Sequence, residues 1–237
     1  MTSSSSSHIC VTAYAYQSTH QICDYFGVLM KPEAIMFDAG GTLILQDHVR
    51  LTEVLSHPMS YEAMFDAHYR AMDAYARRRL ADESVDWTIW QADFFGRLGL
   101  PEPGEGAVLT NNGYGYWSLA IPGAIEAIKN LGIRVGVISN SDGSVTESLR
   151  QAGFDEVFEF VIDSFEVGVS KPDPAIFQAG LDRLGLSGDK VWYVGDSLFH
   201  DVKGGLDAGL DEVVLIDPFD LATEHEPRLP SVAELPA

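Results

Sequence analysis

The sequence predicts an α/β protein with a doubly wound parallel sheet, because short apolar runs alternate with helical patterns along most of the chain. Each run has the length and the lack of charge of a strand that is buried on both faces. The first two runs are separated by the stretch 38–134, which exceeds the needs of one crossover and predicts a helical cap inserted after the first strand. The five runs are Ala34–Phe37, Val135–Ile138, Phe158–Ile162, Val191–Val194 and Val213–Ile216.

Two helices between these strands follow from the spacing of apolar residues. The first covers residues 122–131, and the second covers residues 173–184 and begins with Asp-Pro. Gly132 and Gly185 suit the C-terminal ends of these helices, because many helices end at a glycine in the left-handed conformation.

The inserted segment predicts two amphipathic helices. Ser60 is suited to cap the first, and aromatic and Met side chains recur along both at the spacing of a helix. Such a stripe is typical of packing between helices, and a ligand pocket is the alternative interpretation. The stretch 99–106, which contains Gly and Pro, predicts an exposed loop. The apolar positions are Met64, Phe65, Tyr69, Met72 and Tyr75 in the first helix, and Trp87, Trp90, Phe94, Phe95 and Leu98 in the second.

These patterns divide the chain into an extension, a core and a cap. Residues 1–29 contain a serine run and no periodicity, so they predict a loose N-terminal extension. The core is predicted over residues 30–45 and 120–237, and the helical cap over residues 46–119.

The composition is that of a soluble globular protein with an acidic surface. Acidic residues outnumber basic ones 35 to 15, which gives a formal net charge of −20. This charge disfavours binding to nucleic acid or to an anionic membrane, and no apolar run reaches the roughly 18 residues of a membrane span. We therefore expect a cytoplasmic protein whose partner is a small molecule.

The two cysteines, Cys10 and Cys23, both lie in the predicted extension, which excludes a disulfide-stapled secreted fold. With His8 and His20 they form the pattern H-x-C-x9-H-x2-C. These residue types ligate zinc in other proteins, but the spacing matches no zinc finger or zinc ribbon.

Polar residues follow four of the predicted strands. In open α/β sheets, ligands bind beyond the carboxyl ends of the strands, so these residues are candidates for a site. Each one alone would be an ordinary turn or capping residue. The four sets are Asp38-Ala39-Gly40-Gly41-Thr42-Leu43, Ser139-Asn140, Ser170-Lys171-Pro172, and Gly195-Asp196-Ser197 through Asp201.

The residue types in these sets suit phosphoryl transfer. Asp38 lies in a Gly-rich turn, where backbone N–H groups can approach a developing charge, so it is the candidate nucleophile. Ser139 and Lys171 can neutralise a phosphoryl group, while Asp196 and Asp201 can bind a hard, oxygen-seeking cation.

Taken in this order, the four motifs resemble those of the haloacid dehalogenase superfamily over about residues 33–217. The resemblance implies a Rossmann-like core with a C1-type helical cap that closes over the substrate. It implies that Asp38 forms an aspartyl-phosphate, that Ser139 hydrogen-bonds the transferring group and that Lys171 pairs with both. The implied substrate-binding positions are Gly41, Thr42 and Asn140.

The resemblance also implies a Mg²⁺ site, formed by Asp38, Asp196, Asp201 and the backbone carbonyl of Gly40. The activity that follows is a Mg²⁺-dependent phosphatase acting on a small phosphorylated metabolite.

Position 40 departs from the family pattern. Phosphatases of the superfamily carry a second Asp there as general acid and base, whereas this chain has Gly40. General acid catalysis contributes about 10² to 10⁴ in rate, so we expect a preference for good leaving groups such as acyl phosphates. Asp47 or His48 is a candidate substitute for the missing proton donor.

Three other interpretations remain. Haloacid dehalogenases also lack the second Asp, but they need no Mg²⁺ and usually lose the Gly-Asp that Gly195 and Asp196 retain here. The phosphonoacetaldehyde hydrolase branch needs a cap lysine, and between Asp38 and Ser139 the chain has only Lys129, on a predicted core helix. A catalytically impaired protein that keeps the phosphate and Mg²⁺ cradle is the third.

Overall fold

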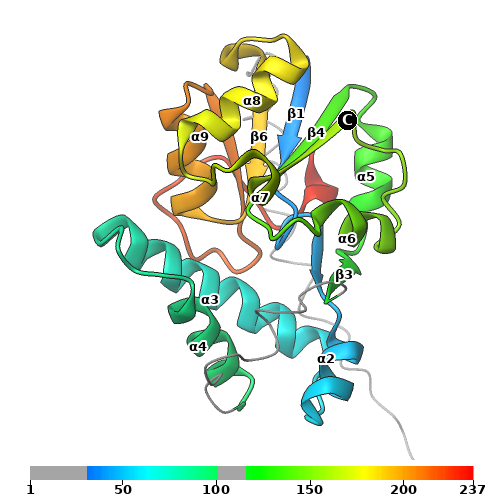
Figure 1. Ribbon diagram of the computed structural model, residues 1–237, viewed down its shortest axis with the longest axis vertical. Coiled ribbons are helices and arrows are strands. Elements are labelled where there is room, and N and C mark those ends of the chain that lie inside the picture. The colour runs from blue at the N-terminus through cyan, green and yellow to red at the C-terminus, as the bar shows by residue number, and fades with distance from the viewer. Residues whose placement is uncertain (1–30, 101–115, 237) are drawn as a thin grey trace, which may run out of the picture. The chain divides into compact units, whose positions relative to one another are not determined.

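A computed structural model describes residues 31–100 and 116–236, and Figure 1 shows how the elements are arranged. Six parallel strands form one sheet in the order β5-β4-β1-β6-β7-β8, with a helical insertion after the first strand, which confirms the predicted fold class. The predicted N-terminal extension and most of the predicted loop 99–106 lie outside the described residues. The strands are β1 Ala34–Phe37, β4 Arg134–Ser139, β5 Phe160–Asp163, β6 Val191–Gly195, β7 Glu212–Ile216 and β8 Arg228–Leu229.

Strand β1 lies inside the sheet, and all four of its residues are buried. It pairs with β4 on one side and β6 on the other, so that Phe37 lies opposite Val137 and Val194. The Asp38 N–H continues this ladder by donating to the Val194 carbonyl at 2.8 Å. The pairing therefore holds Asp38 between the ends of two neighbouring strands.

Helices cover both faces of the sheet, with α8 and α9 on one side and α5 and α6 on the other in Figure 1. Helix α8 confirms its prediction: the Asp173 side chain accepts a hydrogen bond from Ala175 N at 2.9 Å, and Gly185 ends the helix in the left-handed conformation. Phe177 of α8 packs in one buried cluster with Met36 and Tyr193 of the sheet. The bounds are α5 Ala124–Asn130, α6 Val145–Gln151, α7 Ser164–Val167, α8 Pro174–Leu184 and α9 Gly204–Asp207, with short helical turns η1 Gly188–Lys190, η2 Leu198–Lys203 and η3 Val232–Glu234.

Two short strands that the apolar pattern does not predict connect the core to the insertion. Strand β2 (Ile44–Gln46) pairs antiparallel with β3 (Trp117–Ala120), and Ile44 lies opposite Ala120. Strands of three and four residues are too short to produce a periodic signal in the sequence. They bring the two ends of the insertion together beside the Asp38 turn.

The insertion is helical, as predicted. It contains α2 (His48–Leu55), α3 (Tyr61–Ala81) and α4 (Thr88–Arg97). Ser60 caps α3 by accepting a hydrogen bond from Ala63 N at 3.1 Å, which confirms the predicted helix start. Figure 1 shows α3 and α4 beyond the carboxyl end of β1, on the side where ligands bind in this class of fold.

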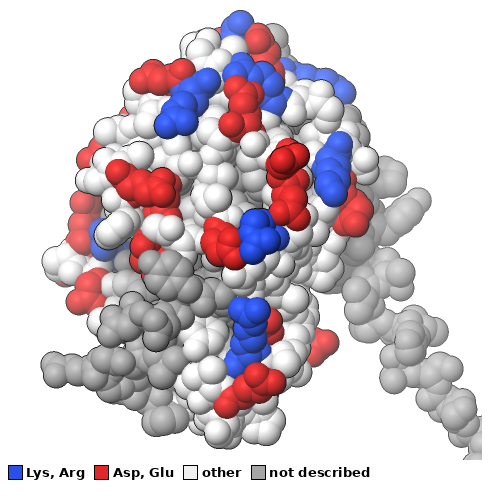
Figure 2. Space-filling model, turned by 45° about the vertical axis from the view of Figure 1, so that its right-hand side comes forward, with Lys and Arg blue, Asp and Glu red and all other residues white. Residues whose placement is uncertain are grey.

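The surface is acidic, with basic residues interspersed. On the face drawn in Figure 2, the described Lys and Arg side chains lie singly or beside acidic side chains, and they form no continuous basic area there. Exposed ion pairs occur among the described residues, for example between Arg134 and Glu159 at 2.5 Å. Among the helices of residues 31–100 and 116–236, none is long and apolar enough to cross a membrane.

Glu212, the first residue of β7, gives a prediction about stability and pH. Burial, followed by the charge of Asp211, raises the pKa of Glu212 from 4.5 to about 7. Because the pKa of Glu212 is higher in the folded state, its protonated carboxyl contributes to the free energy of unfolding. This contribution is fully present below pH 4.5 and is lost as the pH rises through 7. We expect Glu212→Gln to raise the melting temperature at pH 8 by roughly 2 °C, a modest gain because the side chain is partly exposed, and to have little effect at pH 4.

The matched control is Glu166→Gln, which removes an exposed carboxylate elsewhere on the surface. Differential scanning calorimetry at both pH values measures the effect. If the melting temperature rises equally in the two variants, the gain comes from the change in net charge and not from the burial of Glu212.

Candidate active site

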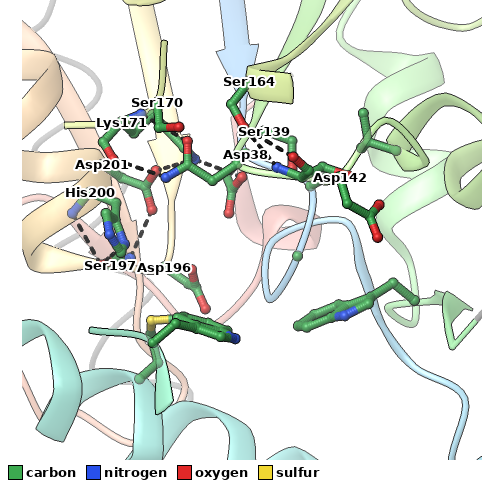
Figure 3. A pocket seen from close by; sticks show the side chains of 18 of the residues that line it. Asp38, Ser139, Asp142, Ser164, Ser170, Lys171, Asp196, Ser197, His200 and Asp201 are labelled. Carbon is green, nitrogen blue, oxygen red and sulfur yellow. Dashed lines mark hydrogen bonds and ion pairs between the residues drawn. The ribbon is translucent and has the colours of Figure 1, made fainter. Parts of the chain in front are cut away.

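A cavity of about 600 Å³ lies between the carboxyl ends of the strands and the insertion. Figure 3 shows the polar side chains from several strand ends gathered around it. A space of this size accommodates a small metabolite. The core side of the lining includes Asp38, Gly40, Ser139, Asn140, Lys171, Asp196 and Asp201, and the opposite side includes Met72, Tyr75, Arg79, Trp87, Gln91 and Trp117.

Lys171 lies at the centre of the polar side and is 4% exposed. Its Nζ atom is 2.7 Å from Asp38 Oδ1 and 2.6 Å from Asp201 Oδ1, and it donates to the Tyr193 hydroxyl at 3.0 Å. Burial alone would lower the pKa of the Lys171 ammonium, but Asp201 and Asp38 outweigh it and raise the pKa. Lys171 therefore stays charged and holds the two carboxylates together.

Asp201 is fixed by the turn that follows β6. It lies on η2, a single π-helical turn, and such turns are frequent at functional sites. The Ser197 N–H donates to Asp201 Oδ2 at 2.9 Å, while the Tyr193 hydroxyl lies 3.2 Å from Asp201 Oδ1. Both carboxylate oxygens are thus oriented by groups from β6 and its turn.

Three carboxylates meet at this point, from Asp38, Asp196 and Asp201. One oxygen of each lies within 4.8 Å of the oxygens of the other two, and all three residues are buried. Burial raises the pKa of Asp38 to about 7 against the opposing effect of Lys171, and burial also raises the pKa of Asp196. A single ammonium does not neutralise three carboxylates, so the oxygen ligands and the excess negative charge both fit a divalent cation such as Mg²⁺.

Asn140 supports the position of Lys171. Its side-chain Nδ2 donates to the Lys171 carbonyl at 2.9 Å, and its Oδ1 accepts from Lys171 N at 2.8 Å. Ser139, at the end of β4, lies beside Asp38 in Figure 3. The structure thus brings Asp38, Ser139, Asn140 and Lys171 together on one wall of the cavity.

Trp117 of β3 occupies the space beside Gly40. A Cβ atom built on Gly40 would lie 2.9 Å from Cζ3 of the Trp117 ring and 3.2 Å from its Cε3, closer than such contacts normally are. The side chain of a second Asp at position 40 would therefore meet the indole. The ring thus fills the space that a side chain at position 40 would need.

Gly41 and Thr42, the other implied substrate-binding positions, are not among the residues that line the cavity. Gly41 has a φ of 74° and faces Asp196 and His68. Thr42 is fully buried, and its hydroxyl has no hydrogen-bond partner among the described residues. Substrate contact by these two residues stays a prediction.

Asp47 and His48, the candidate substitutes for the missing proton donor, also lie away from the cavity lining. The Asp47 carboxylate accepts a hydrogen bond from Val49 N at 2.9 Å and caps α2. The His48 and Tyr61 rings pack edge to face, with their centroids 6.1 Å apart. Their positions suit structural roles in the insertion.

Comparison with known proteins agrees with this geometry. Residues 32–209 match the family described as haloacid dehalogenase-like hydrolase. The chain belongs to this family. Its helical insertion is consistent with the C1-type cap of haloacid dehalogenase-like hydrolases, so we refer to it below as the cap.

Curated relatives include haloacid dehalogenase-like hydrolase domain-containing protein 3 of Danio rerio, which is 30% identical over 76% of this chain and 81% of its own length. Pyrimidine 5′-nucleotidase YjjG of Escherichia coli is 32% identical over 38% of this chain and 42% of its own. Glyceraldehyde 3-phosphate phosphatase of Methanocaldococcus jannaschii is 35% identical over 38% of this chain and 40% of its own. The last two matches span less than half of each protein.

Two solved structures are similar in fold. The HAD-hydrolase YfnB from Bacillus subtilis, bound to magnesium, has a TM-score of 0.60 and 22% identity, covering 86% of this chain and 97% of its own. L-2-haloacid dehalogenase from Xanthobacter autotrophicus has a TM-score of 0.58 and 21% identity, covering 86% and 96%. Because both enzymes share the fold at low identity, the fold alone does not separate their chemistries.

Sequence reasoning missed His68, Trp117 and Tyr193, which this haloacid dehalogenase-like chain places at the candidate site. Tyr193 reads as one more apolar residue of β6, and Trp117 belongs to a strand too short to predict. His68 lies on the same helix face as the stripe that predicts α3, between Met64 and Met72, and its polarity on that apolar face is the one signal that sets it apart.

Asp196 gives a prediction about the metal. The Asp196 Oδ2 atom lies 2.8 Å from His68 Nε2. Asp196→Asn keeps an oxygen that can accept this hydrogen bond but removes the negative charge. We expect the Mg²⁺ Kd to rise by about 10-fold or more while the fold is retained, because the carboxylate serves the cation. Isothermal titration calorimetry measures the binding, and Asp142→Asn, a change at another carboxylate of the cavity lining, is the control.

An unchanged Kd in Asp196→Asn would show that this carboxylate is an ordinary turn residue. It would also remove the main argument against dehalogenase chemistry.

Proposed function

We propose that this protein is a Mg²⁺-dependent phosphohydrolase that acts on a small phosphorylated metabolite through an aspartyl-phosphate. The observation that carries the proposal is the buried cluster of Asp38, Asp196 and Asp201 around Lys171, at the floor of a cavity of metabolite size. Burying three carboxylates is unfavourable unless they are paired. A dehalogenase would use Asp38 as its nucleophile, but it needs no cation and so would have no use for a metal site formed with Asp196 and Asp201.

The proposed reaction begins at Asp38. Its Oδ1 atom pairs with Lys171, which makes Oδ2 the candidate attacking atom. A bond forms between this oxygen and phosphorus, and the bond from phosphorus to the leaving-group oxygen breaks, with its electron pair departing on that oxygen. Water then attacks the phosphorus of the aspartyl-phosphate, and the bond from phosphorus to the Asp38 oxygen breaks, which restores the carboxylate. One proton of the water stays on the released hydrogen phosphate and the other passes to solvent, from which the leaving-group oxygen takes a proton.

The surrounding residues stabilise charge during both steps. Lys171 and the Ser139 hydroxyl lie where they can donate to the phosphoryl oxygens. Asp38, Asp196, Asp201 and the Gly40 carbonyl would hold Mg²⁺. When bound, this cation would supply charge neutralisation of the phosphoryl group and keep Asp38 ionised despite its burial.

The substrate class rests on the cavity and on two relatives. The nucleotidase and the glyceraldehyde 3-phosphate phosphatase act, by their names, on small phosphorylated molecules. The cap side of the cavity offers Tyr75, Trp87 and Trp117 as apolar surfaces and Arg79 as a cation. We extend the proposal to a small phosphorylated metabolite of the cytoplasm.

Dehalogenation of a 2-haloacid is the second candidate function. Gly40 favours it, because halide leaves without a proton and the missing acid would then have no consequence. The acidic cluster disfavours it, since this chemistry needs no cation. A protein that binds phosphate and Mg²⁺ without turnover is the third candidate.

One experiment separates these candidates. The full chain is assayed with and without Mg²⁺ against acetyl phosphate, p-nitrophenyl phosphate, sugar and nucleotide phosphates, and 2-chloropropionate. We expect Mg²⁺-dependent phosphate release and an acid-trapped phosphoryl group on Asp38, both abolished in Asp38→Asn. Chloride release without Mg²⁺ would establish the dehalogenase, and binding without turnover the impaired protein.

The Gly40 position predicts a strong dependence on the leaving group. Without a general acid, aryl and acyl phosphates should be hydrolysed about 10²-fold or more faster than alkyl phosphates, because general acid catalysis contributes about 10² to 10⁴. Steady-state kcat across esters of graded leaving-group pKa, at saturating Mg²⁺, measures this dependence. Similar kcat values for alkyl and aryl esters, while aspartyl-phosphate formation limits the rate, would mean that another residue supplies the proton.

The contact between Trp117 and Gly40 predicts which variants would restore a proton donor at position 40. Gly40→Asp alone should bring little gain in alkyl phosphate hydrolysis, because a Cβ atom at position 40 would lie only 2.9 Å from Cζ3 of the indole. The double variant Gly40→Asp with Trp117→Ala should recover alkyl phosphate hydrolysis by about 10²-fold relative to Trp117→Ala alone. Full recovery in Gly40→Asp by itself would show that the indole moves aside readily.

A further inference from the structure

His68 connects the cap to the acidic cluster. It lies on α3, is fully buried, and its Nε2 atom is 2.8 Å from Asp196 Oδ2. Because a carboxylate oxygen only accepts hydrogen bonds, Nε2 is the donor when Asp196 is ionised. A cap side chain therefore contacts one of the candidate metal ligands directly.

Aromatic side chains hold the His68 ring in this orientation. The rings of Tyr69, Trp90 and Trp117 meet it edge to face, with centroids at 5.0, 5.8 and 5.6 Å. The other ring nitrogen, Nδ1, is buried without a hydrogen-bond partner among the described residues. An apolar side chain would avoid that unpaired nitrogen, so packing alone does not account for a histidine here.

Gly41 leaves the space through which this contact is made. A Cβ atom at position 41 would lie 2.0 Å from Asp196 Oδ2 and 2.3 Å from His68 Nε2, so a side chain there would block the contact. On the next residue of α3, the Tyr69 hydroxyl donates to the Gly41 carbonyl at 2.6 Å. The turn of residues 38–42, called the nucleophile turn below after the proposed role of Asp38, and helix α3 are thus fitted to each other around the contact between His68 and Asp196.

We propose that His68 is a positioning residue that orients Asp196 for a divalent cation. By holding Oδ2, it fixes the rotation of the carboxylate and directs the other oxygen for metal binding, as outer partners of metal ligands do. His68 is not among the residues that line the cavity, so it acts through Asp196 and not on the substrate. The inference rests on the proposed function, because the cation belongs to that proposal.

The test compares two substitutions of similar shape. His68→Gln keeps an N–H donor at about the reach of Nε2, whereas His68→Met fills the same space without a donor. We expect His68→Met to raise the Mg²⁺ Kd about 10-fold or more, and His68→Gln to remain within about 3-fold of the wild type. Isothermal titration calorimetry of the full chain with Mg²⁺ alone measures the Kd, so the result does not depend on turnover.

Tyr69→Phe is the matched control, because it removes a contact between α3 and the nucleophile turn without touching a candidate ligand. Its Mg²⁺ Kd should stay close to that of the wild type. Equal weakening in Tyr69→Phe and His68→Met would indicate general loosening of the cap and would overturn the positioning role.

Melting temperatures establish that each variant is folded before titration. If His68→Met does not fold, the shorter His68→Asn, whose amide does not reach Oδ2, replaces it with the same expected loss. Wild-type affinity in the variant that lacks the hydrogen bond overturns this inference alone. Mg²⁺ binding without phosphohydrolase activity overturns only the proposed function, and no Mg²⁺ binding by the wild type overturns both.

Discussion

The Lys171 ammonium lies between the carboxylates of Asp38 and Asp201, at 2.7 and 2.6 Å, where almost no solvent reaches. The three residues follow different strands, so their contacts exist only when the sheet has formed. Loss of the ammonium would leave two buried carboxylates without their opposite charge, which is strongly destabilising in proteins. With Asp196 as a third carboxylate nearby, this pairing stabilises the cluster and still leaves a negative charge that attracts a cation.

The position of β1 explains why these groups converge. Because β1 lies between β4 and β6, the turns after all three strands open at the same edge of the sheet. The Asp38 N–H is held by Val194, the loop that carries Lys171 is held by Asn140, and Asp201 is turned back toward the cluster by Ser197. Backbone pairing and two side-chain contacts thus place the groups of the candidate site before any ligand binds, which is the condition for electrostatic catalysis.

Much of this arrangement could be predicted from local sequence. The buried strands are apolar runs, Ser60 and Asp173 cap helices where their residue types suggest, and the carboxylates of the cluster follow strand ends in a recognisable order. What could not be predicted depends on contacts between distant segments. The β2 and β3 strands are too short to give a pattern, and His68 meets Asp196 across 128 positions of the chain.

A contact between distant segments also explains why a glycine, and not the second Asp of phosphatases, suits position 40. In the sequence, Gly40 reads as the loss of a proton donor, but the indole of Trp117 fills the space that the lost side chain would need. The same indole meets the His68 ring, and His68 in turn holds Asp196. A side chain restored at position 40 would therefore press on the packing that orients a candidate metal ligand. The glycine is better understood as one member of a packed set, because the absence of a side chain at position 40 leaves the space that the Trp117 ring of β3 fills.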